Sequence, residues 1–172
     1  RVFKIKKIER RFINLEGLDK VVNLFPGVAS VVGNGYRNDL LVRGGGPSEN
    51  RFYLDGVEIP NINHFSTQGA SGGPVGIIDA DFIREVNFYT GAFPANRGSA
   101  LSSVLDFKLL DGNTEKRTVK ATVGASEVSL TSNDYITKNK KTTYLVSVRQ
   151  SYLQLLFKVL DMPFFPRYTD AQ

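Results

Sequence analysis

The sequence predicts an α+β fold: a domain of short strands, short helices and large loops, followed by a hairpin of longer strands. Two observations support this prediction. Segments with apolar residues at every second position are separated by frequent glycine and proline, and the longer alternating segments begin only after Asn113. The 172 residues leave room for one ordinary domain and part of a second.

The N-terminal part of the chain predicts three elements. Residues 1–13 alternate loosely and form either a strand or an extended arm. Over residues 15–25 the apolar side chains recur at spacings of three and four, which predicts a short amphipathic helix. Pro26 and Gly27 end this helix, because proline cannot continue the helical hydrogen bonds. A glycine-containing loop is expected over Ala29–Tyr36.

The middle of the chain predicts short strands joined by turns. Asp39–Arg43 is a strand that three glycines and a proline terminate. Arg51–Ile59 is a hairpin around Asp55-Gly56, because Asp-Gly between apolar residues favours a tight two-residue turn. Residues 60–78 carry no charge and contain four glycines and two prolines, which predicts a long loop. Loops of this length in compact domains are often functional.

The next segments predict one helical turn and two strands. Acidic residues at the start of Asp79–Arg84 favour a short helical turn, because the helix dipole stabilises carboxylates there. Strands are expected over Glu85–Thr90 and Leu101–Leu110, separated by a glycine- and proline-containing loop at Gly91–Ser99.

The pattern changes after Asn113. Arg117–Leu130 and Thr142–Leu153 alternate apolar with small or charged residues, and the polar segment Asn133–Lys141 is expected to form the turn between them. Two interpretations remain open from the pattern alone. One is a soluble antiparallel hairpin, and the other is a pair of strands from a membrane barrel. The apolar and aromatic tail Leu155–Pro166 predicts no definite element.

Composition excludes several classes of protein. A hydrophobic fraction of 41% is too high for a disordered chain. The chain has no cysteine and one histidine, which rules out disulfide frameworks, cysteine nucleophiles and multi-histidine metal sites. No segment has the roughly 18–20 consecutive apolar residues that a membrane-spanning helix needs. Residues 1–13 also lack the apolar core of a signal peptide.

Charge and glycine are unevenly distributed. Lys and Arg number 22 against 17 Asp and Glu, a formal net charge of +5. Residues 27–98 contain no lysine and 13 of the 16 glycines, whereas the flanking segments are basic. The lysine clusters near the two ends are interpreted as solvated surface. The rival interpretation, a nucleic-acid binder, requires a basic stripe accompanied by exposed aromatic residues.

The sequence predicts no enzyme, no catalytic residue, no cofactor and no metal site. His64 is interpreted as a loop residue, because a catalytic triad also needs a nucleophile and an orienting carboxylate. The glycine run at 44–46 lacks both the Gly-Lys-Ser/Thr ending of a phosphate-binding loop and the GxGxxG pattern of a dinucleotide turn. Asp79 and Asp81 fit acids at a helix start better than a catalytic pair.

Four segments, in order, resemble the plug domain of TonB-dependent outer-membrane receptors. They are Leu24–Val28 (LFPGV), Leu41–Gly45 (LVRGG), Asn50–Ile59 (NRFYLDGVEI), and Phe82–Gly98 continued by Ala100–Leu110. Each motif alone is weak, but four in the correct order over residues 18–112 are specific. Asn96-Arg97-Gly98 replaces the usual tyrosine-glycine, which resembles the branch that carries a carboxypeptidase-regulatory-like domain before the plug.

The resemblance implies three parts. These are an N-terminal arm at 1–13, a plug domain with a mixed four-stranded sheet at 14–112, and the first strands of a transmembrane β-barrel at 113–172. Because the family's barrel has about 22 strands, the chain is expected to be a truncated receptor. The family's energy-coupling box is not recognisable in residues 1–13 and is expected upstream.

The resemblance also implies a function: gating energy-coupled uptake of a scarce nutrient across the outer membrane of a Gram-negative cell. The nutrient would be siderophore-bound iron, cobalamin, an oligosaccharide or a peptide. The implied partners are the TonB energy-coupling protein, the receptor's own barrel, and a small-molecule or oligosaccharide ligand, with no nucleic acid. The fragment alone is expected to be soluble. A soluble cell-surface β-rich binding module without transport activity is the alternative; it explains the strands but not the ordered motifs.

Two sets of site residues follow from this interpretation. The uncharged loop at 60–78 is expected to face outward, where amide and aromatic side chains supply hydrogen bonds and stacking surfaces for a polar ligand. The basic and acidic residues of the plug motifs are expected to form ion pairs with the barrel. The ligand set is Asn61, Asn63, His64 and Phe65, and the ion-pair set is Arg43, Arg84 and Glu85.

Overall fold

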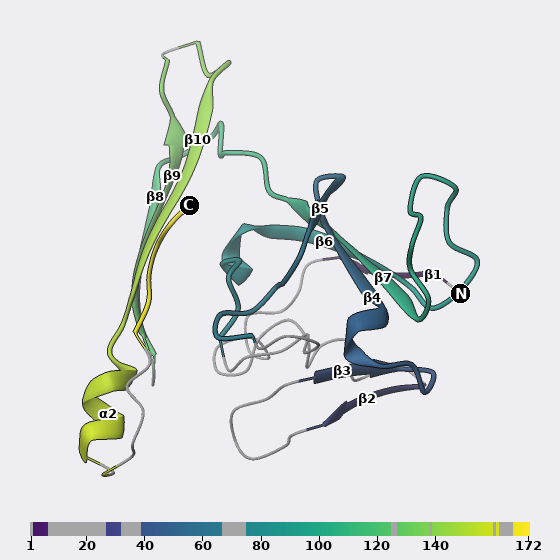
Figure 1. Ribbon diagram of the computed structural model, residues 1–172. Helices are drawn as coiled ribbons and strands as arrows, with labels where there is room; N and C mark the ends of the chain where they lie inside the picture. The colour runs from purple at the N-terminus through teal and green to yellow at the C-terminus, as the bar shows by residue number, and fades with distance from the viewer. Residues whose placement is uncertain are drawn as a thin grey trace. The chain divides into compact units, whose positions relative to one another are not determined.

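The computed structural model describes the chain as two compact units, Arg1–Leu109 and Leu110–Gln172 (Figure 1). The residues that it describes are 2–6, 27–31, 39–66, 75–124, 127–137, 139–159, 161 and 167–172. The helix expected over residues 15–25 lies outside these residues. No helix of the described residues has the length and apolar character needed to cross a membrane.

The first unit is built on a mixed five-stranded sheet with the order β1-β6-β7-β4-β5. The strands are β1 (Val2–Lys6), β4 (Asn50–Leu54), β5 (Val57–Ile59), β6 (Ile83–Tyr89) and β7 (Ser103–Leu109). The β4–β7 pair is parallel and the other pairs are antiparallel. The mixed sheet is confirmed, but it has one strand more than predicted, because the N-terminal segment pairs with β6.

The strand register gives this sheet two chemically different faces. On one face, Phe88 is paired with Leu105 and Leu105 with Phe52, and the next row pairs Val86 with Phe107. These side chains form the buried core together with apolar residues from the loops and the smaller sheet, namely Leu40, Val42, Ile62, Ile78 and Ile83. Because side chains alternate along a strand, the residues between them lie on the opposite, polar face.

The hairpin around Asp55-Gly56 forms as predicted. β4 and β5 pair directly up to Leu54 and Val57, which leaves Asp55 and Gly56 as a two-residue turn. Both turn residues have positive φ, 47° at Asp55 and 89° at Gly56. A type I′ turn requires this conformation at both positions, and Asp-Gly adopts it readily.

A second, two-stranded sheet pairs β2 (Val28–Val31) with β3 (Asp39–Val42). The loop expected from Ala29 was therefore wrong for its first three residues. The strand VASV is too short to show a period, and the partner that orders it is eight residues further along the chain. Strand propensity depends strongly on such context.

Short turns complete the first unit. The predicted helical turn after Asp79 is a single 3₁₀ turn, η2 (Ala80–Phe82), and Asp79 Oδ1 accepts a 2.9 Å hydrogen bond from the Asp81 amide. A second turn, η1 (Pro47–Glu49), leads into β4. The loop expected at Gly91–Ser99 contains no strand or helix.

The second unit contains a four-stranded antiparallel sheet in the order β11-β10-β9-β8. Its strands are β8 (Thr118–Val123), β9 (Glu127–Tyr135), β10 (Thr143–Ser151) and β11 (Thr169–Ala171). The helix α2 (Leu153–Val159) follows β10 and takes up the start of the unassigned tail. In Figure 1, β8, β9 and β10 run side by side as long strands.

The single strand predicted over Arg117–Leu130 was wrong, because the chain turns at Gly124. The Gly124 amide donates a 2.8 Å hydrogen bond to the Glu127 carbonyl, which closes the turn between β8 and β9. Apolar residues occupy odd positions up to Val123 and even positions from Val128. This change of phase at a glycine is the sequence signal for the turn.

A close contact links the two sheets of the first unit. Asn50 Nδ2 donates a 2.7 Å hydrogen bond to the Leu40 carbonyl of β3, and Asn50 Oδ1 accepts a 2.7 Å bond from Ser103 Oγ of β7. Ser102 Oγ donates to the Val42 carbonyl. Gly45 lies at this junction, where a β-carbon would come within 2.5 Å of Ser102 Oγ and 2.6 Å of Ser102 Cβ.

We therefore expect Gly45→Ala to destabilise the first unit by about 1–3 kcal/mol, because the added methyl group forces Ser102 out of its position. Gly98→Ala is the matched control, since a β-carbon at Gly98 would meet nothing within 4 Å. Urea unfolding followed by circular dichroism measures both variants. Equal midpoints for the two variants would contradict the proposed crowding at Gly45.

Candidate functional site

The ends of the uncharged loop at 60–78 are joined by backbone hydrogen bonds. The His64 amide donates to the Val75 carbonyl at 2.7 Å, and the Ile77 amide donates to the Ile62 carbonyl at 2.7 Å. Asn63 and Gly76 form the bridge between these bonds. We call the two paired segments, residues 61–65 and 75–78, the neck of the loop. Ile62 and Ile78, one from each segment, are buried in the core, so both sides of the neck are attached to the first unit.

The four predicted ligand residues lie together at this neck but differ in accessibility. Asn61 and His64 are half-buried, and Phe65 is 37% exposed. The His64 and Phe65 rings are tilted by 49° with centroids 6.0 Å apart, so they present an aromatic pair. Asn63 is only 2% exposed and faces the interior, where it supports the neck. The accessible chemistry is therefore aromatic and amide, without a formal charge.

The predicted ion-pair residues lie on two different sheets. Arg43 follows β3, where its φ is 53° and its amide donates a 2.8 Å bond to the Gly27 carbonyl. Arg43 is exposed, and its side chain runs close to two glycines. A β-carbon added at Gly27 would lie 3.6 Å from Arg43 Cγ, and one added at Gly91 would lie 3.1 Å from Arg43 Nη1. Both glycines have positive φ.

Arg84 and Glu85 are neighbours at the start of β6. Arg84 is exposed and lies at a shift of register between β6 and β7, while Glu85 is paired directly with Lys108 of β7. The register shift allows Arg84 to leave the regular alternation of the strand. Glu85 lies on the polar face of the sheet.

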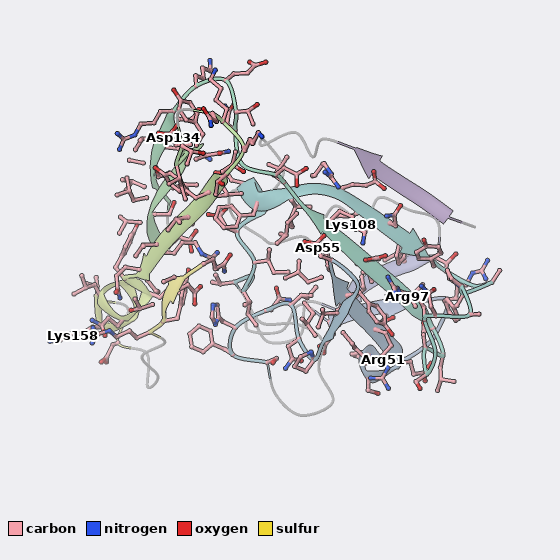
Figure 2. All side chains as sticks on the ribbon, turned by 90° about the horizontal axis from the view of Figure 1, so that it is seen from above. Arg51, Asp55, Arg97, Lys108, Asp134 and Lys158 are labelled. Carbon is pink, nitrogen blue, oxygen red and sulfur yellow. The ribbon has the colours of Figure 1, made fainter. Side chains whose placement is uncertain are left out.

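Sequence reasoning missed a buried polar cluster on this same face. Arg97 Nη2 lies 3.1 Å from Asp106 Oδ2, and the Arg97 guanidinium carbon is 4.4 Å from the centroid of the Tyr53 ring. Lys108 Nζ lies 3.7 Å from Asp106 Oδ1. Figure 2 shows Arg97 and Lys108 beside strands of the first unit. The available signal was the alternation of Asp106 and Lys108 with the apolar residues of β7, although nothing local indicates Arg97 as a partner.

The sheet of the second unit has an exposed apolar face. Direct pairs on this face join Ala121 to Leu130 and Leu130 to Val148. Large apolar side chains on it are at least 40% exposed; they are Val119, Val123, Val128, Leu130, Val146 and Val148.

The other face of the same sheet is polar and more buried. Arg149 Nη2 lies 2.6 Å from Asp170 Oδ2, and Nη1 lies 3.9 Å from Glu127 Oε2. Thr131 Oγ1 donates a 3.1 Å hydrogen bond to Ser147 Oγ. In the first unit the apolar face of the sheet is buried. In the second unit the polar face is the more buried one and the apolar face is exposed. Among the described residues, no group of three His, Cys, Asp or Glu is arranged to hold a metal ion.

Comparison with protein families identifies the first unit. The model of the TonB-dependent receptor plug domain matches residues 1–103, which is more than half of the chain. The chain belongs to this plug-domain family. The predicted resemblance is thus confirmed at the level of the family, while the branch with a carboxypeptidase-regulatory-like domain stays a prediction.

Two solved structures similar to this plug-containing chain are a ferric enterobactin receptor and a pyoverdine outer membrane receptor, both from Pseudomonas aeruginosa. A mutant of the ferric enterobactin receptor PfeA is 19% identical with a TM-score of 0.60, over 87% of this chain and 24% of that one. The pyoverdine receptor FpvA is 18% identical with a TM-score of 0.63, over 88% of this chain and 22% of that one. These likenesses show the fold, and the chain spans about a quarter of each receptor. No curated protein matches the sequence.

Proposed function

We propose that this chain is the plug domain and the opening barrel strands of an outer-membrane receptor that takes up a scarce nutrient by energy-coupled transport. The match of residues 1–103 to the plug family is the observation that supports this most. A plug closes the lumen of its barrel, so the proposed role is gating rather than catalysis. The domain limits at residues 13 and 112 belong to this proposal.

The second unit supports a barrel by the chemistry of its two faces. β9 and β10 have nine residues each, close to the 9–11 residues of a tilted strand that crosses a membrane. The exposed apolar face would contact lipid, and the polar face would contact the lumen. Tyr144 and Tyr152 lie at the two ends of the apolar face, on either side of Val146 and Val148. Tyrosines at such positions suit the two membrane interfaces.

The proposed ligand is a ferric siderophore. PfeA and FpvA are named for ferric enterobactin and pyoverdine, and both have the fold of this chain. The neck of the loop at 60–78 offers Asn61, His64 and Phe65 as neutral hydrogen-bonding and stacking groups, which suits a polar organic ligand. Cobalamin, an oligosaccharide or a peptide are the other ligand classes that the experiment must separate.

The proposed partners are the TonB energy-coupling protein and the receptor's own barrel, and the proposed location is the outer membrane. Arg43, Arg84 and Glu85 are proposed to form ion pairs with the barrel. A soluble cell-surface binding module is the alternative function. The plug-family match and the exposed apolar face of the second unit both favour the receptor.

Uptake by cells with and without the complete gene tests the proposal. We expect radiolabelled ferric siderophore to accumulate only in cells that carry the gene and have an intact energy-coupling system. Cobalamin, an oligosaccharide and a peptide serve as the alternative ligands in parallel cultures. Equal uptake of every ligand in both strains would argue against a transport role.

We expect Phe65→Ala in the complete receptor to weaken ligand binding by about fivefold, because loss of an aromatic stacking surface costs about 1 kcal/mol. Leu101→Ala is the control, since Leu101 is also an exposed apolar side chain of the first unit. Calorimetric titration with the transported ligand measures both. Unchanged affinity in Phe65→Ala would remove Phe65 from the ligand site.

We expect Arg84→Ala to weaken retention of the plug and to destabilise the complete receptor by about 3–5 kcal/mol, because it would leave a buried barrel carboxylate without its partner. Arg51→Ala is the control: Arg51 Nε lies 3.7 Å from Glu58 Oε1, and the two side chains are 39% and 50% exposed. Such a surface pair contributes about 0–1 kcal/mol. If thermal unfolding and plug retention match the wild type, Arg84 does not hold the plug.

The barrel proposal predicts opposite outcomes for lysine on the two faces of the second unit. Val148→Lys, in the middle of the apolar face, should destabilise the receptor in a bilayer by about 2–4 kcal/mol, because the charge would face lipid. Thr122→Lys, on the polar face and paired with the uncharged Ser129, should have a much smaller effect. Denaturant titration in lipid vesicles measures both. Equal costs on the two faces would contradict a lipid-facing apolar surface.

A further inference from the structure

One row of polar residues crosses the whole sheet of the plug. The register pairs Lys4 of β1 with Asn87 of β6, Asn87 with Asp106 of β7, Asp106 with Tyr53 of β4, and Tyr53 with Glu58 of β5. We call these five residues the polar row. Its central members are as inaccessible as core residues, with Asn87 7% exposed and Asp106 5% exposed.

Two oxygens of the polar row are buried without a hydrogen-bond partner. They are Asn87 Oδ1 and Asp106 Oδ1, which belong to directly paired residues on adjacent strands. Lys108 Nζ, at 3.7 Å from Asp106 Oδ1, gives an ion pair but is too distant for a hydrogen bond. Burying an acceptor without a donor is unfavourable, because the water it bonded in the unfolded chain is not replaced.

Arg97 covers the row at Asp106 and Tyr53. It comes from the irregular segment of residues 91–102, which we call the strap. Its guanidinium lies against both Asp106 Oδ2 and the Tyr53 ring, and its side chain is only 12% exposed. In Figure 2 Arg97 lies close to the strands, with Arg51 nearby.

Within the described part of the first unit, the other hydrogen bonds that attach the strap lie at its C-terminal end, where Ser102 Oγ also donates to the Val42 carbonyl. Arg51 Nε donates a 3.1 Å bond to the Ser99 carbonyl, and the Leu101 and Ser102 amides both donate to the Glu49 carbonyl at 3.2 Å. Ala92 and Ser99 have φ of 51° and 61°, a conformation that side-chain-bearing residues adopt at a cost. The closed strap therefore combines one central latch and a strained backbone with an unsatisfied oxygen on Asp106, which the latch contacts, and another on Asn87, the residue paired with Asp106.

We propose that the strap is a cover latched by Arg97, which opens locally over the polar row while the sheet stays folded. Closing gains the contacts of Arg97 with Asp106 and Tyr53. Opening gains hydration of Asn87 and Asp106 and relaxes the backbone of the strap. Because the gains from opening offset part of the lost contacts, opening the strap costs less free energy than unfolding the sheet. The proposal depends on contacts within the first unit and not on which ligand the receptor carries.

Hydrogen exchange of the complete receptor in detergent tests the cover. The reporters are the amides of Arg97, Leu101 and Ser102, which are hydrogen-bonded in the closed strap, and the references are amides of β7. In the wild type we expect the strap amides to exchange at least about tenfold faster than those of β7. If both sets exchange at the same rate, the strap opens only when the sheet unfolds, and the proposal is wrong.

Two variants should shift the strap in opposite directions. Arg97→Gln removes the latch and should speed exchange at Leu101 and Ser102 by about tenfold. Asn87→Leu removes one unsatisfied oxygen at similar volume and should slow the same amides by up to about tenfold. A purely structural role for Asn87 would instead make this variant exchange faster.

Further readings separate a local from a global effect. Exchange of the β7 amides should be unchanged in both variants, and Asn87→Ala repeats the slowing if leucine does not fit. Faster strap exchange in both Asn87 variants, or no change in Arg97→Gln, would overturn the proposal.

Discussion

The alternation of side chains along β7 is the constraint on which the plug sheet depends. β7 is the central strand, paired with β6 on one edge and with β4 on the other. Leu105 and Phe107 are fully buried in the core, and the residue between them, Asp106, lies at the centre of the polar row. A shift of one residue in this register would place the carboxylate in the core and the two apolar side chains among charges. The core and the polar row are therefore consequences of one pairing.

The second unit uses the same period of two with the opposite burial. Leu130 and Val148 are exposed on one face, while Ser147 and Arg149 are buried on the other. In a solvated sheet the apolar face is normally the one that packs against a core. Exposing an apolar face to water is unfavourable, so this arrangement is favourable only if the apolar face contacts something less polar than water. This inverted burial, next to a plug-family domain, is what motivates the proposal that the strands of the second unit face lipid.

Features fixed by local chemistry were the ones predictable from sequence. The Asp55-Gly56 turn was predictable because both positions need positive φ, and the strands on either side alternate clearly. The pairing of β2 with β3 was not, because a four-residue strand is decided by its partner. The candidate site also combines a feature set by local sequence with one set by a distant partner. The loop at 60–78 was evident from composition, but the burial of Asn63 depends on a bridge to Gly76 that no local pattern encodes.

The absence of lysine from residues 27–98 acquires a physical meaning from these contacts. Two arginines of this region have well-defined partners. Arg97 stacks on Tyr53 while it bonds Asp106, and Arg51 donates to the Ser99 carbonyl and forms an ion pair with Glu58. A planar guanidinium can stack and bond at the same time, whereas an ammonium group is a compact and strongly hydrated charge that loses more on burial. The glycines of the same region let the backbone approach closely, as at Gly45 beside Ser102. Arginine and glycine together thus permit charge to be held in tight loops, where a flexible and strongly hydrated ammonium group would be less favourable.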